Sequence, residues 1–349
     1  MKRTETRQAK IGHLLIGGQN KVLIQSMCKH KTSHIEEVVK EINECAALGA
    51  DMMRLAVLDE EDAKAIKEIK KQVKIPLIAD IHFNGDLAIL AIKNGVDKIR
   101  LNPGNINDEN KIKEIVELAK KKKVVIRVGA NSGSINQEVD AFDIPLAHKL
   151  VLSVKKHIQI LEKYDFRDIV VSLKASNIQE TIAAYRLASE LFPYPLHIGI
   201  TEAGPLDISL IRSTAGLAPL LLEGIGDTIR ISITGKAQDE VVAAKRLLHD
   251  CGLYENYPTL VSCPTCGRTQ VDVQPLAKKV FKYLEDNNIL LHVAVMGCVV
   301  NGPGEAKGAD LGIAGGKGQY VIFRKGEVIK KVSEKEAYKE LIAEIEKLR

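Results

Sequence analysis

Short apolar segments alternate with amphipathic helical segments through most of the chain. β-Branched and other apolar residues gather in eight short runs that end in polar or glycine-rich residues, and a stretch with helical periodicity follows each run. The predicted strands are residues 22–27, 52–57, 77–83, 98–101, 124–128, 169–173, 196–200 and 228–233. Eight consecutive strand–helix units predict an α/β fold, an N-terminal (β/α)8 TIM barrel.

Capping residues mark where several of these helices begin and end. Ser33, with Glu36 three residues later, forms a capping-box pattern at the start of a helix. Gly49 closes that helix, and Asp59 opens the next one. Before the first strand, residues 9–18 alternate between apolar and polar and contain a Gly-Gly turn, so we expect a hairpin that closes the floor of the barrel.

The repeat stops near residue 250, and a second domain with another pattern follows. The predicted division is residues 1–250 for the barrel, 251–258 for a linker and 259–349 for a small α/β domain, an α+β sandwich. The predicted elements of this domain are a strand before Cys263, a helix at 273–286, a strand at 292–296 before Cys298, a hairpin at 324–327 and a helix at 333–348. The cysteines therefore lie on loops at strand ends.

The composition narrows the classes of protein to which the chain can belong. The 349 residues are 45% hydrophobic and 27% charged, which suffices for one large core and a smaller one. No window reaches the ~20 apolar residues of a membrane span and residues 1–8 lack a signal core, so we expect a cytoplasmic protein without a membrane segment. A net charge of +5 with 4% aromatic residues argues against nucleic-acid binding.

Positive side chains recur where the predicted barrel strands end, which is where such barrels hold their active sites. The cations, each in or just after a different predicted strand, are Arg54, Arg100, Arg127, Lys174 and Arg230. The carboxylates at comparable positions are Asp80 and Glu202. Since the cations outnumber the carboxylates, we expect an anionic substrate with phosphate groups, to which guanidinium groups donate paired hydrogen bonds.

Asp80 and His82 are two residues apart in a predicted strand, which places both side chains on one face. There the carboxylate would orient or charge the imidazole. The alternative, a buried histidine that only packs, stays open. Gly, Asn and Ser are frequent in the loops after the strands, where backbone N–H groups can cradle phosphate oxygens.

Three of the six cysteines stand in segments typical of a metal site. Cys263, Cys266 and Cys298 lie in Ser-Cys-Pro-Thr-Cys-Gly and Met-Gly-Cys-Val-Val-Asn-Gly-Pro-Gly-Glu. Three thiolates leave one metal position open, which favours an iron-sulfur cluster over structural zinc. Glu305 could join them as a hard, exchangeable ligand, and zinc with His292 as a fourth ligand stays open as an alternative. Cys45 and Cys251 have the settings of packing residues.

The barrel loops and the cysteine segments together resemble one enzyme family over nearly the whole chain. The segments are Ala79-Asp-Ile-His, Asn102-Pro-Gly-Asn, Arg127-Val-Gly-Ala-Asn-Ser-Gly-Ser, Ser172-Leu-Lys-Ala-Ser, His197-Ile-Gly-Ile-Thr-Glu-Ala-Gly, Gly224-Ile-Gly-Asp-Thr-Ile-Arg, Ser262-Cys-Pro-Thr-Cys-Gly-Arg and Met296-Gly-Cys-Val-Val-Asn-Gly-Pro-Gly-Glu-Ala. They resemble the 4-hydroxy-3-methylbut-2-enyl diphosphate synthase family in its two-domain bacterial form. The two cysteine segments, in this order behind a barrel, are the most specific part.

The resemblance implies a [4Fe-4S] cluster held by Cys263, Cys266, Cys298 and Glu305. It implies catalytic roles for Glu305, His82 and Asp80. The residues implied to contact a cyclic diphosphate, or to order the site around it, are Arg54, Arg100, Arg127, Asn131, Lys174, Arg230, Ser232 and Asn301. One loop departs from the family pattern: Cys28-Lys-His-Lys-Thr32 replaces the usual Thr-Asn-Thr-x-Thr, so no contacts are carried over to it.

The reaction that the resemblance implies is the reductive opening of 2-C-methyl-D-erythritol 2,4-cyclodiphosphate, with loss of water, in the non-mevalonate isoprenoid pathway. No G-x-G-x-x-G segment follows a predicted strand, so we expect a flavodoxin or a ferredoxin as electron donor. Two other interpretations stay open. One is a pterin-binding barrel that transfers one-carbon groups and carries a zinc-stabilised appendage, and the other is a non-catalytic module that binds phosphate or nucleic acid.

We expect a homodimer whose active site is shared between chains. The eighth barrel helix, at about 237–249, leads away from the strand ends by ~20 Å, so the second domain is attached near the floor. Residues 251–260 span at most ~35 Å and would be taut if they returned to the mouth of their own barrel. In a head-to-tail pair each cluster domain caps its partner's barrel with a relaxed linker, which the resemblance also implies.

Overall fold

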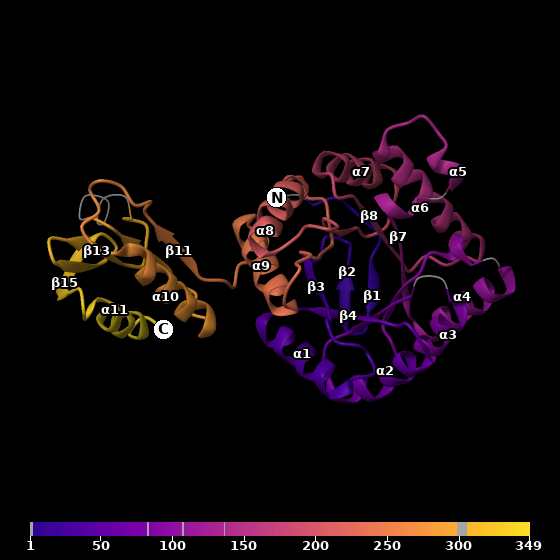
Figure 1. Ribbon diagram of the computed structural model, residues 1–349, viewed down its shortest axis with the longest axis horizontal. Helices are drawn as coiled ribbons and strands as arrows, with labels where there is room; N and C mark the ends of the chain where they lie inside the picture. Colours follow the sequence, from indigo (N-terminus) through magenta and orange to yellow (C-terminus); the bar gives the residue numbers. More distant parts are fainter. Residues whose placement is uncertain (1–2, 82–83, 107, 136, 299–305) are drawn as a thin grey trace. The chain divides into compact units, whose positions relative to one another are not determined.

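The chain divides into two compact units, Met1–Leu253 and Tyr254–Arg349, and each has its own sheet and core (Figure 1). The computed structural model describes residues 3–81, 84–106, 108–135, 137–298 and 306–349. Within these ranges, no helix combines the length and the apolar character that crossing a membrane requires.

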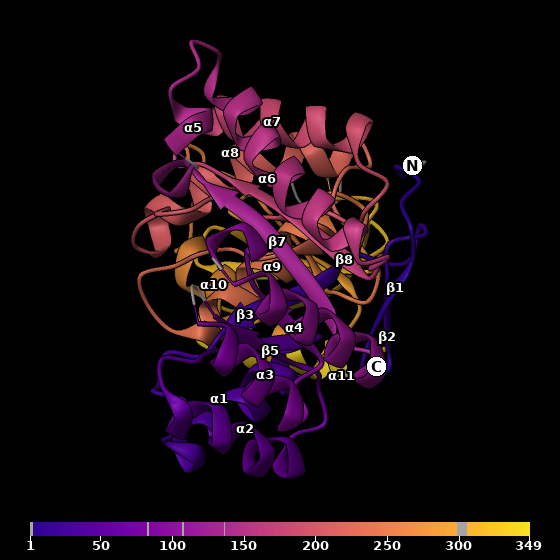
Figure 2. The same cartoon turned by 90° about the vertical axis from the view of Figure 1, so that its right-hand side faces the viewer.

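Eight parallel strands form the centre of the first unit. They are β3 (Leu23–Met27), β4 (Met52–Ala56), β5 (Leu77–Asp80), β6 (Lys98–Arg100), β7 (Val125–Asn131), β8 (Ile169–Lys174), β9 (His197–Ile198) and β10 (Thr228–Ile229). They pair in the order β8-β7-β6-β5-β4-β3-β10-β9, and a parallel bridge between Val171 and Leu196 joins the two ends. The predicted TIM barrel is confirmed, although β9 and β10 are shorter than expected and β7 continues to Asn131 (Figure 2).

Helices surround these strands. They are α1 (Ile35–Leu48), α2 (Glu60–Gln72), α3 (Gly85–Lys93), α4 (Glu109–Lys122), α5 (Gln137–Asp140), α6 (Leu146–Lys163), α7 (Ile178–Leu191), α8 (Leu206–Leu222) and α9 (Ala237–Asp250), with short 3-10 turns at Pro103–Asn105 and Ser132–Ser134. Asp59 caps α2 as predicted, because its side chain accepts a hydrogen bond from Asp62 N at 2.9 Å.

The predicted capping box at Ser33 is wrong. Helix α1 begins one residue later, with His34 at the N-cap position and no side-chain cap. The Ser33 N–H donates instead to Asp62 Oδ1 at 2.9 Å, so a carboxylate of α2 satisfies the backbone group that a box would engage. The predicted end of the helix is confirmed, since Gly49 has the left-handed conformation (φ 107°).

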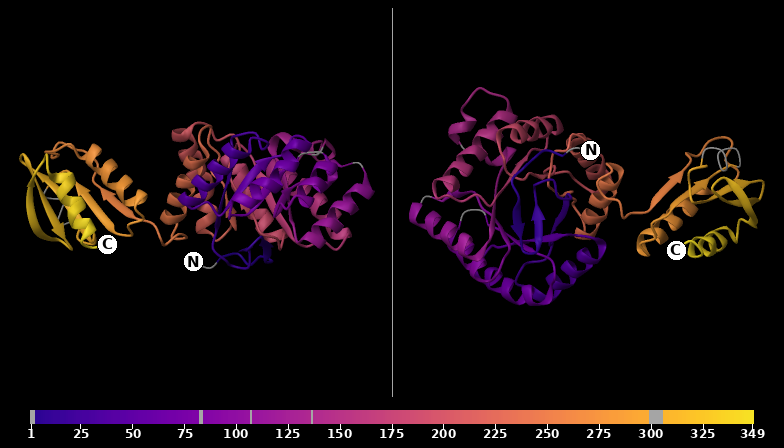
Figure 3. Two further views of the ribbon diagram at one scale, coloured as in Figure 1. Left: turned by 90° about the horizontal axis from the view of Figure 1, so that it is seen from below. Right: turned by 180° about the vertical axis from the view of Figure 1, so that it is seen from behind.

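An N-terminal hairpin closes the floor of the barrel, as predicted. Strands β1 (Ala9–Ile11) and β2 (Leu14–Ile16) pair antiparallel and cross the centre of the ring of helices (Figure 3). Buried Ile11 and Ile16 pack with the first residues of barrel strands, among them Leu23, Met52 and Val125. This apolar plug fills the floor of the barrel.

The second unit is a five-stranded sheet with two helices. The strands, in spatial order, are β11 (Thr259–Ser262), β12 (His292–Met296), β13 (Leu311–Gly316), β14 (Gln319–Arg324) and β15 (Glu327–Ser333), and the helices are α10 (Val273–Asp286) and α11 (Ala337–Glu346). The first three strands are parallel and the last pairs are antiparallel. Both helices pack on one face through Val293 and Val295, whereas Ala294 and Met296 face the other side, next to Cys263.

The sequence analysis missed β13, because Leu-Gly-Ile-Ala-Gly-Gly reads as a loop. Its glycines are required by close packing. A Cβ on Gly312 would lie 2.2 Å from the ring of Phe323, and one on Gly315 would lie 2.1 Å from Val271. The helix predicted at 333–348 also begins later, at Ala337, because β15 continues to Ser333.

Candidate active site

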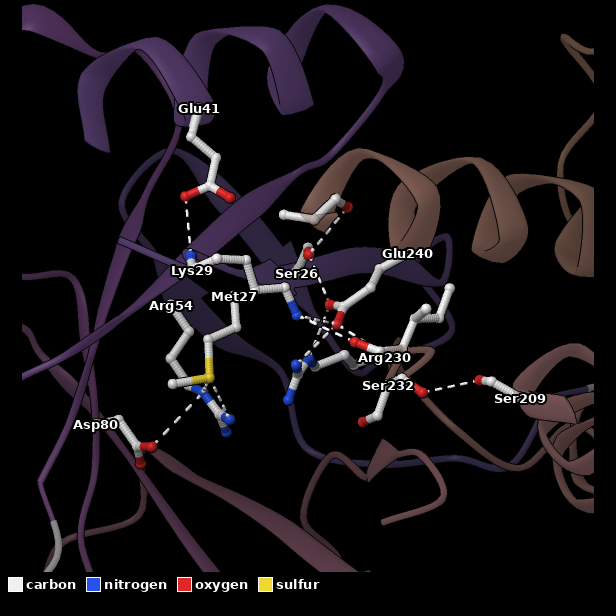
Figure 4. Close-up of polar contacts among 12 residues, drawn as sticks. Ser26, Met27, Lys29, Glu41, Arg54, Asp80, Ser209, Arg230, Ser232 and Glu240 are labelled. Carbon is white, nitrogen blue, oxygen red and sulfur yellow. Dashed lines mark hydrogen bonds and ion pairs between the residues drawn. The ribbon is translucent and has the colours of Figure 1, made fainter. Parts of the chain in front are cut away.

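Three predicted site residues are cross-strand neighbours: Asp80 and Arg100 end β5 and β6, and Arg127 lies within β7. Asp80 pairs with Arg100, and Arg100 pairs with Arg127, so their side chains share one face. Arg54 of β4 joins them, with its Nε 3.8 Å from Asp80 Oδ2 (Figure 4). Arg100 Nη1 is 3.5 Å from Asp80 Oδ1. The Asp80 carboxylate therefore lies between two guanidinium groups.

Arg127 is a buried cation with one side-chain donor that lacks a partner among the described residues. It is 3% exposed, and its Nη1 donates to Ser172 Oγ at 3.1 Å. Its buried Nε has no hydrogen-bond partner in the described part of the chain. Burial lowers the pKa of Arg127 well below its usual value, and Arg54 and Arg100 add to the shift. A buried donor without a partner, among like charges, is a place where an anion binds favourably.

Arg230, just after β10, is held by a carboxylate that the sequence analysis missed. Glu240, in the first turn of α9, accepts from Arg230 Nε at 3.0 Å and from Nη2 at 2.9 Å. The same carboxylate accepts from Lys29 Nζ at 2.7 Å and from Ser26 Oγ at 2.7 Å (Figure 4). Acidic residues in a first helical turn are ordinarily explained by the helix dipole, so nothing in the sequence distinguished Glu240 from its neighbours.

The predicted charge balance needs two corrections. Glu240 replaces Glu202 as the second carboxylate, because Glu202 is exposed. Lys98, fully buried in β6 with its Nζ 3.1 Å from Gln25 Oε1, is a further cation that we did not predict. With Arg54 and Arg100 paired to Asp80 and Arg230 paired to Glu240, the predicted basic groups without a carboxylate partner among the described residues are Arg127 and Lys174.

Lys174 ends β8 and pairs in register with Asn131, the last residue of β7. Its buried amine lies 3.2 Å from His197 Nε2. Burial lowers the pKa of Lys174 well below its usual value, with Arg127 as the next cause. Ser232 is half-buried, and its carbonyl accepts from Ser209 Oγ at 2.8 Å (Figure 4).

Several predicted site residues cannot be placed, since His82, Asn301 and Glu305 lie outside the described residues. The described ones gather in two places. The strand ends of the barrel bring together Arg54, Asp80, Arg100, Arg127, Asn131, Lys174 and Arg230, and the second unit carries Cys263, Cys266 and Cys298.

The three cysteines of the second unit lie on loops that follow neighbouring parallel strands. Ser262 at the end of β11 pairs with Val295 of β12, so Cys263 and the Gly297-Cys298 segment follow side by side. Gly297 N donates to Cys263 Sγ at 3.1 Å. The loop continues with Cys266, which is exposed and whose N–H donates to Thr269 Oγ1 at 3.0 Å.

This arrangement fits an iron-sulfur group by the chemistry of its donors. Thiolates are the usual cluster ligands, and backbone N–H groups that donate to sulfur stabilise them. The backbone N–H of Arg268, and then its side chain, lowers the pKa of Cys266, which favours the thiolate. Among the described side chains, no group of three His, Cys, Asp or Glu converges as a metal site. Glu305 lies outside the described residues.

The remaining cysteines are buried thiols. Cys45 and Cys251 are buried, as predicted, and so is Cys28. Burial, followed by Glu41, raises the pKa of Cys28 well above its usual value and that of Cys45 to about 12. These side chains are therefore poor ligands for a soft metal at neutral pH.

Known families match both units of the chain. Residues 6–245 match the GcpE TIM-barrel domain, and residues 259–347 match the GcpE protein C-terminal domain. A Clostridium perfringens protein described as 4-hydroxy-3-methylbut-2-en-1-yl diphosphate synthase (flavodoxin) is 49% identical over 347 residues, which cover 99% of each chain. A Bacillus velezensis protein with the same description is 48% identical and is matched over 99% of this chain and 92% of its own.

Solved structures resemble a large part of the chain. A dihydropteroate synthase from Stenotrophomonas maltophilia superposes with a TM-score of 0.54 over 71% of this chain and 98% of its own, at 13% identity. At this identity the likeness shows the fold only.

Proposed function

The chain belongs to the GcpE family, and from this premise we propose how its two units share the work of a 4-hydroxy-3-methylbut-2-en-1-yl diphosphate synthase. The protein is an oxidoreductase that converts 2-C-methyl-D-erythritol 2,4-cyclodiphosphate into 4-hydroxy-3-methylbut-2-enyl diphosphate in the non-mevalonate pathway. The observation that carries this conclusion is the 49% identity over 99% of the chain. In our proposal, residues 1–250 bind the diphosphate, 251–258 link the domains and 259–349 carry the cluster.

The diphosphate binds at the strand ends of the barrel. Arg127 and Lys174 are the predicted basic groups without a carboxylate partner among the described residues, and the Nε of Arg127, which has no hydrogen-bond partner there, is a donor for a phosphate oxygen. Arg54 and Arg100 are oriented by Asp80, and Arg230 by Glu240. Asn131, Ser232 and Asn301 complete the polar contacts. The cations offset negative charge on phosphate as the C–O bond to it breaks.

A [4Fe-4S] cluster is the redox group of the second unit, with Cys263, Cys266, Cys298 and Glu305 as its ligands. The adjacent cysteine loops and the Gly297 N–H donor to Cys263 support this assignment. When bound, such a cluster supplies single-electron transfer and a Lewis-acidic iron. Glu305 and His82 are the groups that we assign to proton transfer to the departing hydroxyl, and Asp80 orients Arg54 and Arg100.

The partners of the protein follow from the family. The names of the relatives specify flavodoxin, so we propose a flavodoxin, with ferredoxin as the alternative donor. We also propose a cytoplasmic homodimer in which the cluster domain of one chain serves the barrel of the other.

The barrel site is tested by Arg127→Ala, with exposed Arg186→Ala as the control. Arg127→Ala should weaken binding of the cyclic diphosphate by roughly 1.5 to 3 kcal/mol, the worth of a charge-assisted hydrogen bond, without changing the visible spectrum of anaerobically purified enzyme. Arg186→Ala should change neither. Unchanged affinity in Arg127→Ala would place the diphosphate elsewhere. Iron and sulfide analysis of the same samples tests the cluster, which requires about four of each per chain.

A further inference from the structure

His197 lies behind Lys174 and links it to the next strand. Lys174 Nζ is 3.2 Å from His197 Nε2, and the other ring nitrogen, Nδ1, is 2.7 Å from Thr228 Oγ1. His197 and Thr228 are cross-strand partners on β9 and β10, and both are fully buried. Three neighbouring strands thus contribute one polar chain that ends at the amine of Lys174.

A glycine and two hydrogen bonds near Lys174 fix the position of its amine. A Cβ on Gly199 would lie 2.8 Å from Lys174 Nζ and 2.7 Å from the Arg230 carbonyl oxygen, so the absence of a side chain makes room for the amine. Tyr185 OH donates to His197 O at 2.6 Å and accepts from Leu173 N at 3.2 Å. These two bonds hold β8 and β9 in the register that aligns the amine with the imidazole.

Both contacts of the polar chain can be hydrogen bonds in two protonation states. When Lys174 is charged, its ammonium donates to His197 Nε2, and the Nδ1–H donates to Thr228 Oγ1. When Lys174 is neutral, Nε2–H donates to the amine, and the hydroxyl donates to Nδ1. Since a hydroxyl both donates and accepts, the contact between Lys174 and His197 and the contact between His197 and Thr228 are hydrogen bonds in either state. The two states differ by one proton.

The charges around the pair favour the neutral state when no anion is bound. The charged or titratable groups that face it are Arg54, Lys98, Arg127, Tyr185, Arg230 and Glu240. Burial and then Arg127 lower the pKa of Lys174, while burial and then Lys174 lower that of His197. A dianion in the site reverses this balance, because a nearby opposite charge favours the charged amine.

We propose that His197 is a positioning residue of the diphosphate site, which holds the amine of Lys174 in place and allows it to take up one proton from solvent as the diphosphate binds. The proposal rests on the role of Lys174 as a diphosphate contact. The sign of the effect follows from linkage: the complex holds one more proton than the free enzyme, so affinity is highest at low pH and decreases as pH rises. The decrease is at most about tenfold per pH unit for one proton.

Calorimetry of substrate binding tests the proposal. The holoenzyme is titrated with the cyclic diphosphate under argon, without a reductant, in two buffers that differ in ionisation enthalpy. Each phosphorus of the cyclic diphosphate carries one strongly acidic group, so the ligand itself takes up no proton near neutral pH. Wild-type enzyme should take up a proton number that approaches one as pH rises, while the association constant falls.

Two matched pairs of variants separate positioning from packing. Thr228→Ser keeps the hydroxyl and should bind like wild type, whereas Thr228→Val removes it. His197→Gln places an amide near the position of Nε2 and should retain most of the affinity. The shorter amide in His197→Asn reaches Thr228 but not Lys174. Thr228→Val and His197→Asn should each bind at least about fivefold more weakly at pH 8, with the fall in affinity beginning at lower pH. Exposed His148→Gln is the control and should change nothing.

The outcomes also separate this proposal from the one on which it rests. If Thr228→Val and His197→Asn lose stability but keep the wild-type proton number and pH dependence, His197 only packs and the inference is wrong. If Lys174→Met binds the cyclic diphosphate as wild type does, the role of Lys174 as a diphosphate contact is wrong. Loss of affinity in Lys174→Met, with a normal pH dependence in the His197 variants, overturns the inference alone.

Discussion

Replacing Glu240 by Gln removes one negative charge from the centre of a buried network without changing its shape. The carboxylate, 1% exposed, holds both nitrogens of the Arg230 fork as well as Lys29 and Ser26. Burial raises the pKa of Glu240, but Arg230 and Lys29 outweigh it, so the net shift is downward and the group is charged at neutral pH. Breaking a buried ion pair costs about 3 to 5 kcal/mol, and we expect about 3 kcal/mol because the amide oxygen still accepts one hydrogen bond.

Urea unfolding of the variant, measured with and without the cyclic diphosphate, provides the test. The free enzyme should lose about 3 kcal/mol of unfolding free energy. The diphosphate should stabilise Glu240→Gln more than wild type, because the ligand takes over neutralisation of Arg230. Asp239→Asn, one residue earlier in the same helical turn, is the matched control for the helix dipole and should lose less than about 1 kcal/mol. Equal losses in the two variants would refute the role of Glu240 as the partner of Arg230.

Three further predictions use other parts of the chain. Replacement of Cys263, Cys266 or Cys298 by Ser should abolish iron retention under argon, whereas the same change at Cys28, Cys45 or Cys251 should leave the iron content unchanged; full retention in Cys298→Ser would contradict the ligand assignment. His157 accepts from Gly104 N at 3.2 Å, and burial, then Arg100, lowers its pKa to about 4. Its contribution to stability is therefore complete above pH ~6.5 and lost toward pH 4, by about 1.4 kcal/mol per pH unit and about 3 kcal/mol in all, and denaturation of His157→Gln should lack this dependence. Mixing inactive Arg127→Ala and Cys298→Ser subunits should restore activity after exchange if the site is shared between chains, and persistent inactivity with exchange confirmed would assign each site to one chain.

The architecture was predictable because apolar periodicity is a local property of the chain. Runs such as Val125–Val128 and the amphipathic pattern of Val273–Asp286 decide the type of element within a few residues. The prediction failed where a tertiary contact overrides the local pattern. Gly312 packs beneath Phe323 in a strand that reads as a loop, and Asp62 takes the Ser33 N–H that a capping box would have engaged.

Some charged residues of the candidate site were likewise predictable from the local sequence, whereas others depend on tertiary contacts. Most of the cations were predictable, since Arg54, Arg100, Arg127, Lys174 and Arg230 each lie in or just after a recognisable strand. The partners of these cations were not predictable, because the folding of the barrel decides which distant residues meet. Glu240 is 211 residues from Lys29, and His197 lies 23 residues from Lys174 on the next strand. A count of charges along the sequence therefore overestimates the free cations, as it did for Arg230.

The loop that departs from the family pattern, residues 28–32, contacts both α1 and α9 through Lys29. The backbone of Lys29 is tied to α1 through Glu41 Oε2 at 2.9 Å, and its amine reaches Glu240 at 2.7 Å. Lys29 and Arg230 therefore divide one carboxylate between them, which leaves the pair with one net positive charge rather than none. An extra cation introduced by the loop thus strengthens the field that attracts a dianion, at the place where the barrel already holds Arg54 and Arg230.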